Sequence, residues 1–294
     1  MKAYILLIFT AMFFAGNLIV GKPVTQEIPP ITLSFCRYMI AFFVILPVGY
    51  FEWKRNKSLW KREWKAILSL SITGLVLFNI CVYSALQYTT SINAGIVEAS
   101  TPIFTLVLSF LLFKERFNKK QLLGVFISLF GVCIVITKGS LEIILGLQFN
   151  IGDLIMLLAM ITWAVYSMFI KQHMWKFPAY GALLVMSAVS IIIFIPLLGV
   201  EAGDIAQIEW SWKVIAGLLY LGIFPSLVAL IAFNKGVQEI GPSRASIFLN
   251  LIPVFTMIGA ILFLGEKLQL IQLAGAILVI SGVLITNHNK KKTA

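Results

Sequence analysis

Long apolar stretches recur along this chain, and they constrain its fold more than any other feature. A helix needs about 20 consecutive apolar residues to cross the hydrocarbon core of a bilayer. Stretches of this length follow one another here with only short connections between them, and hydrophobic residues make up 60% of the chain. Since charged residues make up only 12%, no segment is left for a water-soluble domain. The sequence therefore predicts an all-α membrane protein.

The apolar stretches divide into ten predicted transmembrane helices. They lie near residues 3–22, 31–51, 66–88, 92–113, 121–138, 152–171, 179–199, 212–235, 243–264 and 269–287. The first stretch lacks a small-x-small cleavage site and is long for a signal peptide, so we expect it to remain as a helix. The cysteines lie singly within spans, which favours a packing role over a disulfide or metal site.

The distribution of Lys and Arg predicts the orientation of the helices. Cytoplasmic loops retain positive charge. With both termini in the cytoplasm, that side receives 18 of the 23 Lys and Arg residues and the other side receives four, while Arg37 lies within a span. We therefore expect a plasma-membrane protein, of a bacterial inner membrane, with both termini cytoplasmic. Topology and contact with membrane lipid account for the net charge of +11, without a nucleic-acid partner.

The two halves of the chain resemble each other. At a constant offset of 151, Gln87, Ala94, Pro102, Glu115, Gly124 and Gly131 recur as Gln238, Ala245, Pro253, Glu266, Gly275 and Gly282. At an offset of 149, Lys22 pairs with Lys171 and Pro47 with Pro196. Each half, 1–144 and 145–294, holds five spans, so the second half must enter the membrane upside down. Inverted repeats of this kind are typical of secondary transporters, in which the transport site lies where the repeats meet.

The motifs of both halves resemble the EamA-type branch of the drug/metabolite transporter superfamily. The resemblance covers essentially the whole chain. The residues that carry it are Asn17, Pro29-Pro30, Arg37-Tyr38, Glu98 to Pro102 with Lys114-Glu115, Pro253 to Gly265-Glu266, Gly275 and Gly282. One departure is Phe14-Ala15-Gly16, where the family often has a tryptophan before two small residues. The resemblance implies ten helices around a central cavity and export or exchange of small metabolites, often amino acids.

Arg37 and Glu98 are the most unusual side chains for a membrane interior. A charge in hydrocarbon costs roughly 2.5 to 3.5 kcal/mol and persists when it is paired or hydrated. Both residues lie about 10 Å below the outer interface, counted at 1.5 Å per helical residue. They could be partners in a structural ion pair, Arg37 could extend to the interface, or both could bind substrate. Glu98 is also the candidate for a proton-linked step.

Three prolines are candidates for helix breaks or gates. Pro102 and Pro253 occupy matching positions near the centre of their predicted helices, where each removes a hydrogen bond and bends the helix. Pro225 adds a break whose counterpart in the first half is Gly74. Carbonyl groups freed at such breaks can face a cavity, although proline also supplies packing curvature in membrane helices.

Further polar and aromatic side chains are candidates for a mostly apolar binding pocket. With Arg37 and Glu98, the predicted substrate site comprises Asn17, Asn79, Tyr83, Trp163, Tyr166 and Asn250. Polar residues also join membrane helices to one another, so part of this set is expected to be structural. We interpret Gly124, Gly131, Gly275 and Gly282 as helix-packing residues. We expect Glu115 and Glu266 to form local ion pairs with Arg116 and Lys267.

The sequence favours a secondary transporter over a membrane enzyme. It contains no metal-ligand cluster, nucleophile motif or phosphate-binding loop, so we expect no catalytic residue and no cofactor. We expect a monomer that carries a small metabolite, amino-acid-like because a guanidinium pairs well with a carboxylate. The alternatives are a carrier or flippase of lipophilic drug-like or lipid substrates, a polytopic enzyme, and a helical scaffold. The substrate, the direction of flux and the coupling ion are not fixed by the sequence.

Overall fold

The computed structural model describes residues 2–113, 119–137, 139, 150–233, 248–249 and 251–287. Within these residues all regular elements are helices, in agreement with the predicted class. Six helical segments of the described chain are long and apolar enough to cross a membrane: Ile5–Glu27, Pro30–Arg55, Trp64–Tyr88, Ile151–Ile170, Ala179–Ile205 and Trp212–Phe233. The protein is therefore a multi-pass helical membrane protein.

The elements follow in chain order with short connections. The first half contains α1 (Lys2–Glu27), α2 (Pro30–Arg55), α3 (Lys57–Arg62), α4 (Trp64–Leu70), η1 (Ser71–Leu77), α5 (Phe78–Tyr88), α6 (Ser91–Glu98), α7 (Thr101–Phe113) and α8 (Lys119–Ile136). The second half contains α10 (Ile151–His173), η2 (Met174–Lys176), α11 (Ala179–Leu197), η3 (Leu198–Glu201), α12 (Ala202–Ile205), α13 (Trp212–Ile223), η4 (Phe224–Ala229), α16 (Ile252–Leu264) and α17 (Leu270–Asn287).

Local sequence signals define several of these helix ends. The side chains of Thr90, Asn150 and Ser211 accept hydrogen bonds from backbone N–H groups in the first turns of α6, α10 and α13. These short polar side chains satisfy donors that a helix start leaves free. Pro30 begins α2, where its missing N–H is not needed. Gly265 ends α16 with a φ of 65°, a left-handed conformation that favours glycine.

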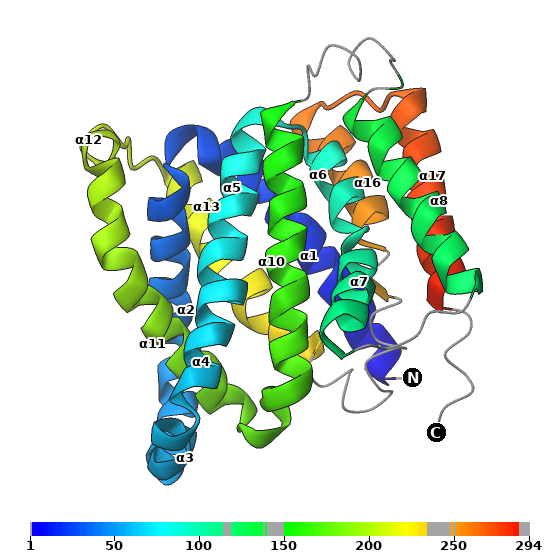
Figure 1. Cartoon of the computed structure of the whole chain (residues 1–294). Coiled ribbons are helices and arrows are strands. Elements are labelled where there is room, and N and C mark those ends of the chain that lie inside the picture. The colour runs from blue at the N-terminus through cyan, green and yellow to red at the C-terminus, as the bar shows by residue number, and fades with distance from the viewer. Residues whose placement is uncertain are drawn as a thin grey trace.

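The helices form a bundle with a pair of helices at each edge (Figure 1). The α2 and α11 helices lie side by side at one edge, and α8 and α17 pack together at the opposite edge. The start of α1, the end of α17 and α3 lie at one end of the bundle, and α12 lies at the other (Figure 1). The central helices α1, α5, α10 and α13 are thus enclosed between the two edge pairs.

Glycines allow close approach of α8 and α17, as the sequence predicts. A Cβ atom at Gly131 would lie 2.8 Å from the carbonyl oxygen of Gly275, and one at Gly282 would lie 2.5 Å from that of Gly124. Because Gly131 meets Gly275 while Gly282 meets Gly124, the two helices run antiparallel. The absence of side chains at these positions is what permits backbone contact.

Apolar side chains fill the interior and also cover the outside of the bundle. One cluster of buried residues joins α1, α5, α6, α10 and α13, and a second joins α2, α11 and the α3–α4 region. Large apolar side chains are nevertheless exposed on the outer helices, including Phe126 on α8, Ile192 on α11 and Phe263 on α16. Such extensive apolar exposure is typical of a surface that contacts lipid rather than water.

The helix predicted over residues 92–113 is divided, which differs from the single bent helix expected there. The α6 helix ends at Glu98, and α7 begins at Thr101. Pro102 is therefore the second residue of a new helix, and Pro253 likewise is the second residue of α16. Proline fits the first turn of a helix because its missing N–H has no partner there. Both prolines mark helix starts rather than bends within a continuous helix.

Two segments with π-helical hydrogen bonding interrupt the third and eighth predicted spans. They are η1 and η4, and the sequence offset brings Gly74 of η1 into correspondence with Pro225 of η4. The prediction of an irregularity at Pro225 agrees with η4. The irregularity at η1 has no proline, but Gly74 approaches Tyr166 so closely that a Cβ atom would lie 2.4 Å from its ring. Such π-helical turns are frequent at functional sites.

Candidate functional site

Arg37 is the centre of a buried polar cluster. Its Nε donates a hydrogen bond to the Ser226 hydroxyl (2.9 Å), and its Nη1 donates to Asn17 Oδ1 (3.1 Å), to Asn79 Oδ1 (2.7 Å) and to the Tyr83 hydroxyl. Asn17 comes from α1, Arg37 from α2, Asn79 and Tyr83 from α5, and Ser226 from η4. Four of the predicted site residues therefore meet at one point inside the bundle.

The acceptors around Arg37 are themselves held in place. Asn79 Nδ2 donates to the Tyr38 hydroxyl (2.8 Å) and to the Leu75 carbonyl (2.9 Å), which orients its Oδ1 toward the guanidinium. The Tyr83 hydroxyl donates to Asn17 Oδ1 at 2.8 Å. Since a buried amide or hydroxyl without partners is costly, this mutual bonding stabilises one arrangement of the cluster.

Arg37 has no anionic partner among the described residues. The acceptors that it contacts are two amides and two hydroxyls, all neutral. Its Nη2 donates no hydrogen bond to any described residue, and the side chain is only 4% exposed. The ion pair with Glu98 considered from the sequence does not form. Equal depth along two helices does not make side chains face each other, because the rotation of each helix decides their direction.

Glu98 is a second charge-bearing side chain in the interior. It is the last residue of α6, immediately before the break that separates α6 from α7, and it is partly buried. Within the described part of the chain its carboxylate forms no hydrogen bond or ion pair, although it interacts electrostatically with Tyr83.

Aromatic side chains lie next to the Arg37 cluster. The Trp163 ring on α10 lies with its centroid 4.6 Å from that of Phe78, 5.0 Å from Tyr166 and 6.5 Å from Phe14. Phe78 precedes Asn79 on α5, and Phe14 lies one helical turn before Asn17 on α1. Trp163 and Tyr166 of α10 thus form an aromatic group with Phe14 and Phe78, which lie on two of the helices that carry the cluster, but they are not among the hydrogen-bond partners of Arg37.

Of the other residues that concern the site, some were predicted from the sequence and some were not. Asn250 lies outside the described residues. Pro225 is buried and directly precedes Ser226, so the irregular η4 segment positions one partner of Arg37. Ser226 and Tyr38 were not predicted as site residues. Their signals in the sequence are weak, since each is a single polar group, although Ser226 follows an expected break and Tyr38 follows Arg37 directly.

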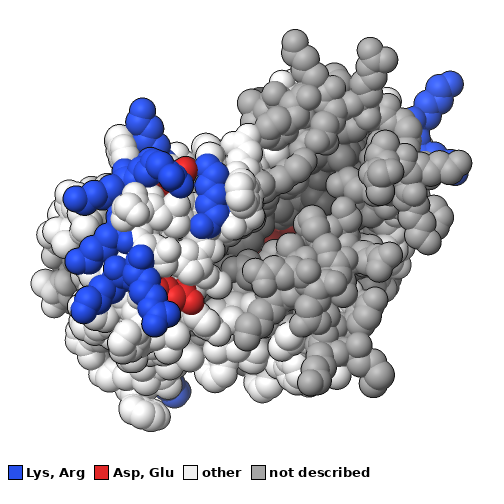
Figure 2. Space-filling view, turned by 90° about the horizontal axis from the view of Figure 1, so that it is seen from below, with Lys and Arg blue, Asp and Glu red and all other residues white. Residues whose placement is uncertain are grey.

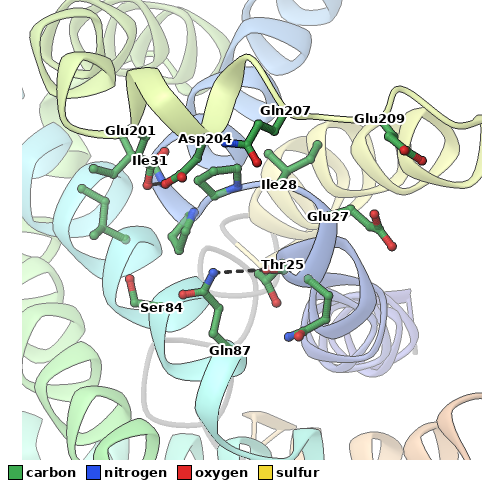
Figure 3. Close-up of a pocket in the computed structure, with 14 residues that line it drawn as sticks. Thr25, Glu27, Ile28, Ile31, Ser84, Gln87, Glu201, Asp204, Gln207 and Glu209 are labelled. Carbon is green, nitrogen blue, oxygen red and sulfur yellow. Dashed lines mark hydrogen bonds between the residues drawn. The ribbon is translucent and has the colours of Figure 1, made fainter.

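A vestibule of about 790 Å³ lies at the end of the bundle that carries α12 (Figure 3). Its walls come from the end of α1, the start of α2, one face of α5 and the chain around α12. Four acidic residues line it, namely Glu27, Glu201, Asp204 and Glu209, and no group of them within the described chain has the arrangement of a metal site. On α5, Ile80 and Ser84 line the vestibule while their neighbours Asn79 and Tyr83 contact Arg37.

Two carboxylates join α2 and α11 reciprocally at their ends. Glu201, after α11, accepts hydrogen bonds from the backbone N–H groups of Ile31 (2.9 Å) and Thr32 (2.8 Å) at the start of α2. Glu52, near the end of α2, accepts one from the N–H of Gly181 (2.6 Å) at the start of α11. The two glutamates differ by 149 in number, the offset found between the halves, and that shared offset was the signal that could have identified them.

Glu266 also binds a helix start rather than a neighbouring cation. Its two carboxylate oxygens accept hydrogen bonds from the N–H groups of Ser91 (2.8 Å) and Ile92 (3.1 Å) in the first turn of α6. The expected ion pair with Lys267 is not formed. A carboxylate is favoured at a helix start because it satisfies free donors and faces the positive end of the helix dipole. The expectation for Glu115 falls outside the described residues.

Comparisons with known proteins agree with this architecture. The sequence profile of the EamA-like transporter family matches residues 1–137 and again residues 150–288. The uncharacterized transporter YyaM of Bacillus subtilis is 30% identical over 289 residues, which are 97% of this chain and 93% of that protein. An uncharacterized transporter of Archaeoglobus fulgidus is 28% identical and covers 97% of each chain. A solved crystal structure with 18% identity has a TM-score of 0.62 over 95% of this chain and 94% of its own, a likeness of fold.

Proposed function

Since the chain belongs to the EamA-like transporter family and is a membrane transporter, we propose that it exports or exchanges a small carboxylate-bearing, amino-acid-like metabolite by alternating access. The observation that carries this proposal is the buried guanidinium of Arg37, which lacks an anionic partner among the described residues. A charge in this position costs free energy that a negatively charged substrate would offset.

The geometry around Arg37 favours a carboxylate as the group that binds. Four neutral acceptors engage Nε and Nη1 and fix the plane of the guanidinium. The free Nη2 then carries the two donors that remain for a substrate oxygen. Hydrogen bonds between a guanidinium and a carboxylate are short and strong. The adjacent aromatic group of Trp163, Tyr166 and Phe78 supplies an apolar wall for the rest of a small molecule.

We propose the inverted-repeat architecture of ten helices as the basis of the mechanism. It is supported by the two separate matches to the family, 1–137 and 150–288, and by the equivalent contacts that corresponding residues of the two halves make. Glu52 and Glu201 correspond to each other, and each binds the start of a helix in the other half. Gly131 and Gly282 also correspond, and each lies against a glycine of the partner helix. In transporters built this way, one half moves against the other around a site at their interface.

The proposed orientation places both termini and the α3 end of the bundle in the cytoplasm, within a plasma membrane. Exposed Lys and Arg side chains gather at the α3 end (Figure 2), comprising Lys54, Arg55, Lys57, Lys61, Arg62 and Lys65. The α12 end carries the acidic vestibule instead. This asymmetry is the one expected for a cytoplasmic and an outer face. Because both halves are fused, we propose that one chain suffices for transport.

We further propose that Glu98 exchanges a proton during the transport cycle. Its carboxylate is partly accessible, has no ion-pair partner among the described residues, and lies at a break between two helices. A carboxylate in these surroundings can accept or release a proton as the cavity changes its access from one side to the other. Movement of substrate would then be coupled to the proton gradient.

Uptake into proteoliposomes tests the proposed function. A panel of labelled amino acids and nucleobases is offered to wild-type protein and to the Arg37→Gln variant, with Ser34→Ala as a matched control on the same helix. Ser34 is buried like Arg37, but among the described residues its hydroxyl bonds only to the Pro30 carbonyl within α2. We expect saturable uptake of a carboxylate-bearing class by the wild type and the control, and a loss of roughly 10- to 100-fold in Arg37→Gln.

Two outcomes would contradict the proposal. Uptake of lipophilic cations or lipid analogues without uptake of any carboxylate would favour the alternative class of substrate. Carboxylate uptake that persists unchanged in Arg37→Gln would show that the guanidinium is structural.

The proposed role of Glu98 is tested separately. Uptake by Glu98→Gln is measured with and without an imposed proton gradient. If the variant responds to the gradient as the wild type does, Glu98 does not take part in proton coupling.

A further inference from the structure

The start of α6 is buried and held by side chains from the second half of the chain. Glu266 accepts hydrogen bonds from the N–H groups of Ser91 and Ile92, and Gln272 Nε2 donates to Asn93 Oδ1 at 2.7 Å. Ser91 and Ile92 are almost completely inaccessible. We call the contacts of Glu266 and Gln272 with residues 91–93 the outer latch, since they lie at the end of the bundle opposite α3.

The outer latch joins two segments that match the transporter family separately. Residues 91–93 belong to the first matched segment, and Glu266 and Gln272 belong to the second. At this end the start of α6 is closed against the second half by these hydrogen bonds.

The α2–α11 pair differs from α6 in how its ends are held. Glu201 binds one end of that pair and Glu52 binds the other, so these two helices are joined at both ends. By contrast, the outer end of α6 is held by the latch together with Asp153 of α10, which accepts a hydrogen bond from Asn93 Nδ2 (3.3 Å), and its inner end is Glu98 at the break before α7. The inner end therefore has no continuous helix that would keep α6 in place when its outer end is released.

The latch also influences the wall of the vestibule. Lys22 lies within electrostatic range of Glu266, and its Nζ donates to the Leu86 carbonyl near the end of α5 at 2.6 Å. The next residue, Gln87, lines the vestibule and donates to the Thr25 carbonyl (Figure 3). The carboxylate of Glu266 thus acts on the start of α6 directly and on the end of α5 through Lys22.

We propose that the outer latch is a conformational device that closes the outer side, and that release of Glu266 from the start of α6 permits this side to open. The inference rests on the alternating access of the proposed function, but it does not depend on the identity of the substrate. Two charge-assisted hydrogen bonds hold the closed state, so removing the charge shifts the population of states toward the open one.

Thiol accessibility measures this shift without a transport assay. The three native cysteines are replaced by serine, and Ser91→Cys supplies a buried reporter directly under the latch. Membrane vesicles are then treated with a membrane-impermeant maleimide from each side. We expect slow labelling in the parent and at least about tenfold faster labelling from the outer side in Glu266→Gln. Gln272→Leu, which removes the bond to Asn93, should give a smaller increase.

Glu201→Gln is the matched control, because Glu201 is also a carboxylate that binds a helix start in the other half. Its labelling rate at Ser91→Cys should equal that of the parent. Unchanged labelling in both Glu266→Gln and Gln272→Leu, or an equal increase in Glu201→Gln, would overturn the latch. A rate increase confined to the α3 side would also overturn it. Because no substrate is present, failure of the proposed substrate class would leave these rates unaffected.

Discussion

The charged side chains at the centre of the bundle and those at its ends differ in the groups that surround them. Glu52, Glu201 and Glu266 at the ends each accept hydrogen bonds from backbone N–H groups at a helix start in the other half. In the centre, Arg37 contacts neutral acceptors, and Glu98 has no ion-pair partner among the described residues. A charge satisfied by backbone groups stabilises the fold, whereas a buried charge without a counter-charge is what the proposed binding of a charged substrate requires.

Arg37→Lys should produce the largest effect that distinguishes the centre of the bundle from its ends, and the effect should be on substrate binding. Lysine keeps the positive charge but lacks the planar set of donors that contacts four side chains at once. We expect the KM for a carboxylate substrate to rise about 10- to 100-fold, with a much smaller change in thermal stability. The concentration dependence of uptake into proteoliposomes measures this. A large loss of stability with an unchanged KM would mean that Arg37 resembles the residues at the ends.

Glu201→Ala should do the reverse: it should lower the stability of the protein and leave the KM unchanged. The variant leaves the N–H groups of Ile31 and Thr32 without their acceptor, and we expect a loss of about 2 to 4 kcal/mol of stability. The KM should remain that of the wild type. Thermal unfolding in detergent measures the change, with Asp204→Ala as the control because this nearby acidic side chain is exposed. An altered KM at wild-type stability would contradict the separation of roles.

Gly131→Ala tests a contact between two helices that involves no charged side chain. The added Cβ would lie 2.8 Å from the Gly275 carbonyl oxygen on α17, so the two helices must move apart. We expect a loss of about 1 to 3 kcal/mol of stability and no change in KM. Gly199→Ala is the control, since a Cβ there would meet nothing within 4 Å. Equal thermal midpoints for the two variants would show that close packing of α8 and α17 contributes little.

The smallest expected effect concerns Glu63, at the α3 end of the bundle. A hydrogen bond from Lys176 Nζ (3.0 Å) lowers the pKa of this carboxyl group below its ordinary value of 4.5. The charged form is therefore favoured in the folded protein, and the stability that it contributes is present above pH 4.5 and is lost as the pH falls through the lowered pKa.

Thermal midpoints of the wild type and Glu63→Gln, measured over a pH series, test this. Their difference should be constant near neutral pH and should shrink below pH 4.5. Because the pair is close to solvent, high salt should reduce the difference at every pH. A difference that grows on acidification would have the wrong sign for a lowered pKa.

The sequence predicted the helical membrane class because hydropathy requires no knowledge of tertiary structure. It also identified Asn17, Arg37, Asn79 and Tyr83, since polar groups within apolar spans are few and costly. It could not predict that these four residues meet while Glu98 remains apart. Depth follows from counting residues along a helix, but the direction of a side chain depends on how each helix is rotated within the bundle.

The sequence also showed that residues of the two halves correspond, but it did not show which contacts these residues make. The offset that relates Pro47 to Pro196 also relates Glu52 to Glu201, yet an offset does not state which helices touch. The division between α6 and α7 was missed because Pro102 is compatible with either a bend or a helix start, and because the polar Ser100 and Thr101 before it were too few to end the apolar span. Proline signalled η4 but not η1, where Gly74 takes its place.

The two π-helical segments determine the direction in which the partners of Arg37 point. A π-helical turn contains one residue more than an α-helical turn. One residue corresponds to a rotation of about 100° and an advance of about 1.5 Å along the axis. The η1 segment precedes Asn79 and Tyr83, and η4 contains Ser226. Deleting a single residue from either segment would turn these acceptors away from the guanidinium, so the direction of the site is encoded in the number of residues as well as in their chemistry.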